Sequence, residues 1–150
     1  YEPIIDKNIF LIECKYRIAS DPPDKYVFCD LLNTINLLLK QCVPNKQDIH
    51  KVLDEKLDCH LLKQYIDSGN DTMKHYSNLF YVILEYLKLF QSKSADDKLN
   101  QLKIKIENGF YFNNEKNKLI IMFFFEIINN INIIIKQRED FFKFIDNNKK

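Results

Sequence analysis

Cysteine and histidine are the residues of this chain whose chemistry suits metal binding or nucleophilic catalysis. The chain has four cysteines and three histidines, and neither a CxxC pair nor an HExxH motif sets them at ligand spacing: Cys14, Cys29, Cys42, Cys59, His50, His60 and His75. His60 follows Cys59 directly, but adjacent residues of a helix point in different directions. We therefore predict no metal site. A Cys–His pair that meets only in space stays open, because no local motif reports it.

The even number of cysteines allows two interpretations. Two disulfides would suit a secreted protein. A helical domain of 150 residues, however, buries a core large enough to be stable without such links. We therefore expect reduced, structural thiols in an intracellular, cytoplasmic protein.

Motifs for phosphate, dinucleotide or acyl chemistry are absent from the sequence. No GxxxxGK, GxGxxG or GxSxG pattern occurs, and the chain has only two glycines with which to build one. Two acid pairs, Asp96-Asp97 and Glu139-Asp140, lie near predicted helix ends. Interaction with the helix dipole explains the first pair and solvation explains the second. The sequence thus predicts no catalytic residue, no cofactor and no enzymatic activity.

The charge balance bears on nucleic-acid binding. The chain has 22 basic and 21 acidic side chains, for a formal net charge of +1. Binding to phosphate backbones requires a clustered excess of Lys and Arg. Pairs such as Lys103/Lys105 and Lys149-Lys150 are better explained as parts of solvated helix faces. We predict no nucleic-acid partner.

The elements that must position these residues are predicted from apolar spacing. Apolar residues recur in steps of three and four, and two glycines with four prolines favour long helices with few turns. We predict helices over residues 4–19, 21–42, 46–55, 59–67, 73–91, 96–109 and 115–144. The fold class is all-α, a single-domain bundle of about six or seven helices around an apolar C-terminal helix.

Capping and terminating residues set the predicted boundaries. Asp21 can cap the second helix, with proline tolerated in its first turn, and Gly69 is suited to terminate the fourth. Ser94 begins a capping-box pattern before the sixth helix, which should close at Gly109. Asn113-Asn114 marks a loop before the last helix.

The last predicted helix is the most apolar part of the chain. Residues 119–125 are all apolar, and isoleucines continue the run until charges return at Lys136. A membrane-spanning helix needs about 20 mainly apolar residues, and polar residues interrupt this one at its middle: Glu126, Asn129, Asn130 and Asn132. We predict a core helix covered by its neighbours and no membrane span.

Aromatic residues indicate two candidate surfaces. Phe123, Phe124 and Phe125 span about 200° of a helix, and we expect neighbouring helices to cover all three, although one could face a partner. Phe110, Tyr111 and Phe112 follow Gly109 in a predicted connecting segment. They either fold onto the core or form an exposed partner surface. We take these three residues as the candidate binding site.

Several stretches, in order, resemble the T-complex protein 11 family. The opening helix from Lys7 leads to a DPPD-like element and then to a Leu-rich helix, LLNTINLLLKQCVP. The stretches LDCHLLKQYIDSG, DDKLNQL and FFEIINNINIII follow at similar spacing. No single stretch is distinctive, and the order of the four carries the resemblance. Residues 89–95 depart from the family, which usually shows a Leu-Cys-Ala-Pro pattern there.

The resemblance implies a cytoplasmic, helical, non-enzymatic protein linked to cyclic-AMP and protein kinase A signalling and to sperm function. It also implies that this chain is the N-terminal part of the family domain, in line with a sequence that begins at Tyr1 and that we expect to be an excerpt. Three hypotheses follow. The first is a regulatory interaction domain of this family. The second is a bundle whose hydrophobic groove, expected beside Phe123 to Ile135 of the last helix, binds a partner helix, as in apoptosis regulators. The third is an unrecognised hydrolase or transferase.

Overall fold

The structure, a computed structural model, describes residues 7–91, 96–112 and 116–148. Over these ranges the chain forms seven helices and no strand: α1 (Lys7–Ala19), α2 (Tyr26–Cys42), α3 (Gln47–Lys56), α4 (Cys59–Asp67), α5 (Met73–Phe90), α6 (Asp96–Phe112) and α7 (Lys116–Asn148). The predicted all-α fold class is confirmed for the described part of the chain.

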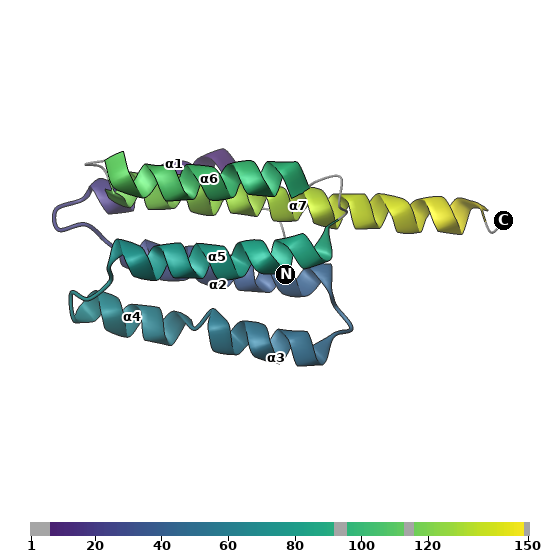
Figure 1. The fold of residues 1–150 in the computed structure, drawn as a ribbon, viewed down its shortest axis with the longest axis horizontal. Helices are drawn as coiled ribbons and strands as arrows, with labels where there is room; N and C mark the ends of the chain where they lie inside the picture. The colour runs from purple at the N-terminus through teal and green to yellow at the C-terminus, as the bar shows by residue number, and fades with distance from the viewer. Residues whose placement is uncertain (1–6, 92–95, 113–115, 149–150) are drawn as a thin grey trace.

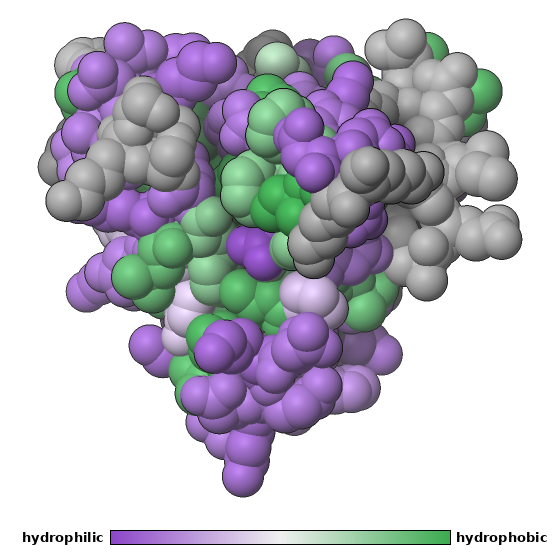
Figure 2. All heavy atoms as spheres, turned by 90° about the vertical axis from the view of Figure 1, so that its right-hand side faces the viewer, coloured by the Kyte–Doolittle hydropathy of each residue, from purple (hydrophilic) through white to green (hydrophobic). Residues whose placement is uncertain are grey.

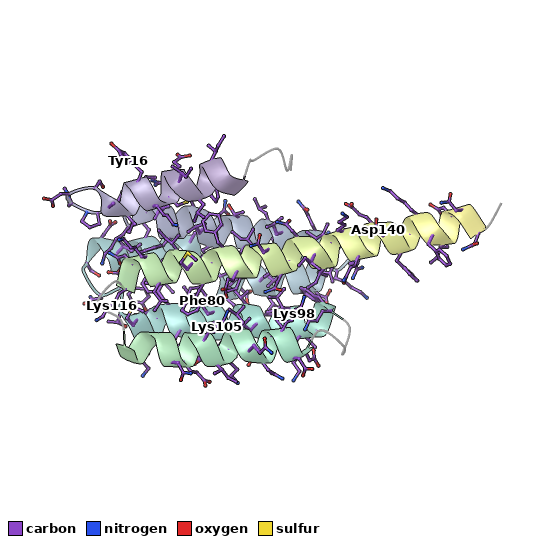
Figure 3. The ribbon with its side chains drawn as sticks, turned by 90° about the horizontal axis from the view of Figure 1, so that it is seen from above. Tyr16, Phe80, Lys98, Lys105, Lys116 and Asp140 are labelled. Atoms are coloured by element: carbon purple, nitrogen blue, oxygen red, sulfur yellow. The ribbon has the colours of Figure 1, made fainter. Side chains whose placement is uncertain are left out.

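The helices form a bundle around a central pair, α2 and α7 (Figure 1). α3 and α4 pack against α2 on the side away from α7. Seen from above, α1 lies along one side of α7 and α6 along the other (Figure 3). The C-terminal part of α7 extends beyond the other helices (Figure 1). The predicted central role of the last helix therefore holds only for its first part, and α2 shares that role.

α2 is central because its apolar residues occupy almost every position that faces a neighbour. At about 100° per residue its buried apolar residues lie within an arc of about 140°: Val27, Phe28, Leu31, Leu32, Ile35, Leu38, Leu39 and Cys42. This arc is wider than the roughly 100° apolar stripe of a surface helix, so several elements are needed to cover it. α1, α3, α4, α5 and α7 all contact it.

The three consecutive phenylalanines of α7 are all buried, as predicted. Phe124 packs on Phe80 of α5, with ring centroids 4.9 Å apart, and Phe123 contacts the same ring at 5.9 Å. Phe125 points the other way, to Phe10 of α1 at 5.5 Å. The three phenylalanines point in different directions around α7, and α5 and α1 cover them from different sides.

The predicted start of the second helix at Asp21 is wrong, because α2 begins at Tyr26. Asp21 and Pro22 each precede a proline, and that position disfavours the helical conformation. The helix starts only after Asp24, whose Oδ1 accepts a hydrogen bond from the Tyr26 backbone N–H at 3.2 Å. Asp24 also accepts from Arg17 Nε at 2.8 Å, which ties the connection to α1.

The other helix ends either agree with the predicted ones or differ from them by a few residues. α4 matches the prediction, and Gly69 after it has φ of 72°, the left-handed conformation that favours glycine. α6 does not close at Gly109 but runs to Phe112, because a helical glycine costs only about 1 kcal/mol and does not by itself end a helix. α7 runs four residues past Phe144, to Asn148. The predicted Ser94 cap and the loop at Asn113-Asn114 lie outside the described residues.

A buried carboxylate joins the start of α2 to the α4–α5 connection. Asp71, whose side chain is 3% exposed, accepts hydrogen bonds from Lys25 Nζ at 3.2 Å and from Tyr76 Oη at 3.0 Å. Burial and the neighbouring Asp71 carboxylate raise the pKa of Tyr76 above its ordinary value. The phenol therefore stays protonated and serves as a donor to Asp71 at all ordinary pH values.

We predict that Leu32→Ala lowers the free energy of unfolding by about 2–5 kcal/mol, because Leu32 is fully buried in the central helix. Leu37→Ala, on the same helix at a side chain that is 40% exposed, is the matched control and should cost less than about 1 kcal/mol. Urea denaturation measures both. Equal losses for the two variants would contradict the central position of α2.

We predict that Asp71→Asn costs about 1–3 kcal/mol of stability, because two hydrogen bonds to a charged acceptor are weakened in a buried site. Asp140→Asn, at an exposed position, should change stability by less than about 0.5 kcal/mol. Thermal denaturation of both variants is the measurement. Unchanged stability in Asp71→Asn would show that this carboxylate does not hold the two segments together.

Candidate functional site

The predicted site, Phe110, Tyr111 and Phe112, lies in the last turn of α6 rather than in a connecting segment. The expected loop is therefore wrong at the level of the backbone. The side chains of these residues lie outside the described part of the structure, so their role as a partner surface stays a prediction.

The cysteines and histidines do not converge on one site within the described residues, where no group of three metal-ligating side chains is found. Cys14 and Cys42 are buried, and Cys29 and Cys59 are half-buried. Two of the cysteines are linked by a weak hydrogen bond, in which the Cys59 Sγ donates to the Cys29 carbonyl oxygen at 3.6 Å. Desolvation by burial raises the pKa of each of the four thiols to about 11. Protonated, buried thiols are poor nucleophiles.

His50 and His75 make contacts between neighbouring elements, and His60 is exposed. His50 Nε2 lies 2.7 Å from the Val43 carbonyl oxygen, which joins α3 to the end of α2. The ring of His75 stacks on Tyr65 with centroids 4.2 Å apart, and its Nδ1 accepts from the Thr72 backbone N–H at 3.4 Å. His60 is exposed near the start of α4. His50 and His75 therefore have a structural role, since each connects two neighbouring elements.

The largest hollow among those described lies between α5 and α6 and has a volume of about 550 Å³. Its charged lining residues alternate in sign: Glu85, Lys88, Asp96, Lys103 and Glu107. Lys103 Nζ lies 5.8 Å from the centroid of the Tyr81 ring, so this cation is held on an aromatic face. The hollow is open and mixed in charge, and its described lining includes no Ser, Thr, Cys or His.

The C-terminal part of α7 has three exposed phenylalanines within four residues. We define the projecting segment as residues 136–148. Its phenylalanines are exposed by 59% at Phe141, 57% at Phe142 and 66% at Phe144, and Phe141 and Phe142 lie edge to face at 6.1 Å. Figure 3 shows the segment, with Asp140 labelled, extending past the ends of the other helices.

The apolar face of the projecting segment continues the face that α7 buries inside the bundle. Steps of three and four lead from the buried Ile131 and Ile134 to Arg138, Phe141 and Ile145. The same helix face thus passes from core to surface where α2 and α5 end, because none of the described helices covers it farther along. A helix face with this register is built to pack against another helix.

Two described hollows border the segment where it leaves the bundle. One, of about 320 Å³, is lined by Phe90, Gln91, Ile134, Gln137, Arg138, Phe141 and Phe142. The other, of about 490 Å³, is lined on the α2 side by residues 41 and 43–46 and on α7 by Ile135, Arg138, Glu139 and Phe142. Figure 2 looks onto this end of the molecule and shows apolar residues near its centre, surrounded by hydrophilic ones. The segment and its two hollows form the candidate site.

Arg138 is the charged residue within this apolar face. It lines both hollows and is half-buried. Among the described residues it has no carboxylate within ion-pair distance. Its guanidinium acts on the Cys42 thiol, where it opposes part of the increase in pKa that burial causes. A partner carboxylate would stabilise this cation.

A second exposed apolar stripe lies on the outer face of α1. Ile9, Ile12 and Tyr16 are exposed, and Figure 3 shows Tyr16 pointing away from the bundle. The apolar residues of α1 thus form two faces, since Cys14 and Ile18 are buried against the bundle.

The fold defines the chain as an all-α helical bundle. Comparison with protein-family models, with curated proteins and with solved structures finds no match. The resemblance to the T-complex protein 11 family therefore rests on the sequence stretches alone. α7 is long and apolar enough to cross a membrane, with a mean hydropathy of 1.8 in its most apolar window, half of which is buried in the fold. This is weak evidence for a span, because a core helix passes the same test.

We predict that native thiols react slowly with iodoacetamide. At pH 8 a thiol with a pKa of about 11 is ionised in about one molecule in a thousand, against about one in ten for the ordinary value of 9.0. Alkylation followed by mass spectrometry should therefore be about 100-fold slower than for a peptide thiol, and unfolding in urea should restore the peptide rate. A cysteine that reacts at the peptide rate in the native protein would instead support a nucleophilic role.

Proposed function

We propose that this chain is a non-enzymatic protein-interaction domain that binds its partner through the projecting segment, residues 136–148. The observation that carries the proposal is the exposure of Phe141, Phe142 and Phe144 on one helix that leaves the bundle. Aromatic residues dominate the binding energy of protein interfaces. Exposed apolar patches of this kind often mark the sites at which proteins bind one another.

The arrangement of charges supports binding by one face. The polar back of the segment has three charged residues of alternating sign at steps of three and four: Lys136, Glu139 and Lys143. Pairs at these spacings stabilise an exposed helix by about 0.2–0.5 kcal/mol each. The back of the helix is thereby suited to solvent, which leaves the apolar face for a partner.

We further propose that the partner belongs to cytoplasmic signalling through cyclic AMP and protein kinase A. This finer assignment rests on the resemblance to the T-complex protein 11 family, in sequence stretches such as Leu57–Gly69 and Phe124–Ile135. No catalytic residue, metal, nucleic acid or membrane span is part of the proposal.

A second candidate function is the binding of a partner helix in a groove. An open hollow of about 210 Å³ lies between α4 and α5, with an apolar floor formed by Leu61, Leu62, Leu79 and Val82. Leu61 is 46% exposed, and Lys56 and Asp58 stand at the edge. An amphipathic helix that places apolar residues into such a groove is a recurring mode of recognition.

Proximity labelling in cells that express the protein tests the proposal. We predict that Phe141→Ser combined with Phe144→Ser removes most labelled partners, because it removes the largest exposed apolar groups of the segment. Ile12→Ser is the matched control, because Ile12 and Phe144 are equally exposed at 66%, and it should leave the labelled set unchanged. Circular dichroism should be the same for all variants.

The same experiment separates the two candidates. Loss of partners in Leu61→Glu, with the double phenylalanine variant unaffected, would favour the groove between α4 and α5. A labelled set that neither change alters would refute both surfaces. Absence of any cyclic-AMP or kinase-pathway protein from the set would count against the signalling assignment alone.

A further inference from the structure

We propose that the projecting segment pairs antiparallel with the same segment of a second copy of this chain, with Phe142 at the two-fold axis. The inference deepens the proposed interaction function and rests on it, since it names one partner for the same surface. Three observations support it: the order of residues along one stripe, the apolar area available, and the position of the two hollows.

The stripe Arg138, Phe142 and Asp146 has a cation, an aromatic ring and an anion at steps of four, so the three side chains lie along one side of the helix. A two-fold antiparallel pair brings the same side of each helix together. Residues equally far from Phe142 then lie opposite each other. Arg138 of one copy meets Asp146 of the other, twice, with the two Phe142 rings between them. The stripe is therefore complementary to itself.

This pairing gives Arg138 an ion-pair partner. Within the described residues Arg138 has no ion-pair partner, although it is half-buried in an apolar face between two hollows. Asp146 is exposed near the far end of α7. A segment of 13 residues is about 20 Å long, so full antiparallel overlap brings the end of each helix to the base of the other.

The hollows lie where those ends arrive. At the base of the segment, the hollow of about 320 Å³ presents Phe90 and Ile134. In the antiparallel pair Ile145 of the second copy, the apolar residue nearest the described end of α7, lies opposite Glu139, next to Arg138 of the lining. The interface thus continues the face that α7 already uses inside the bundle, with the second copy in place of α2 and α5.

The area predicts a modest affinity. With about 200 Å² for each phenylalanine, the exposed fractions of Phe141 and Phe142 give roughly 230 Å² of apolar surface per copy. Phe144 lies about 160° round the helix from Phe142 and faces away from this interface. The pair would bury roughly 460 Å² through the two phenylalanines, well under half of the ~1,200 Å² at the lower limit of stable interfaces. The rest must come from Ile145 and the hollows. We therefore expect a dissociation constant in the upper micromolar range.

Sedimentation equilibrium of the whole chain over about 1–500 µM tests the pairing. We expect a monomer–dimer equilibrium that Phe142→Ser weakens at least tenfold. Arg138→Glu and Asp146→Arg should each weaken it at least tenfold, because each sets like charges opposite one another. The double variant restores opposite charges and should return to within about threefold of the original affinity. Lys143→Glu, on the polar back of the same helix, is the matched control and should have little effect.

Three results would overturn the inference. The chain could remain monomeric over the whole range, or dimerise with an affinity that charge reversal at Arg138 and Asp146 leaves unchanged. The third is a chain that stays monomeric and sediments with phosphatidylcholine vesicles in a Phe142-dependent way, which would assign the segment to a lipid surface. A monomer whose labelled partners still depend on Phe141 and Phe144 would refute only the self-pairing and leave the proposed function in place.

Discussion

Phe124 of α7 lies between Phe28 of α2 and Phe80 of α5, with ring centroids 6.4 and 4.9 Å away. This contact stands at the centre of the packing between α2 and α7, and the other helices attach around it. All three rings are fully buried. Buried aromatic pairs contribute about 0.5–1.5 kcal/mol beyond the burial of their area, and interiors packed at this density tolerate few changes of volume. The helices at the edge of the bundle, including α3 and α4, are held in place by packing on the surface of the α2–α7 pair.

The same packing creates the candidate site through a difference in length. α7 has 33 residues and α2 has 17, which correspond to about 50 Å and 25 Å of helix. The two helices pair along the shorter one, and α5, with 18 residues, ends near the same level (Figure 1). The remaining part of α7 keeps its apolar register, and no other described helix runs alongside it. Exposure of Phe141, Phe142 and Phe144 is thus a consequence of how the core is built.

The sequence analysis located the fold more securely than the site. Apolar spacing predicted seven helices with bounds close to those observed, because a three-and-four periodicity reports a helix whatever its neighbours are. It misplaced the start of α2, where consecutive prolines outweigh a capping aspartate, and the end of α6, where Gly109 stays helical. It placed the partner surface at Phe110–Phe112 because the helix was expected to end before them. A sequence signal for the projecting segment was present, since Phe141, Phe142 and Phe144 follow the point at which charges return at Lys136.

The sequence by itself determined the helices, the apolar faces and the self-complementary order of Arg138, Phe142 and Asp146, because these depend only on residue type and spacing along one helix. It could not determine which apolar faces are covered. Ile9 and Ile12 on α1 have the same residue type as Ile18, yet they are exposed and Ile18 is buried. That difference depends on where the neighbouring helices lie and how far they extend. Only the tertiary structure decided it, since burial is a property of the packed assembly of helices and not of any one of them.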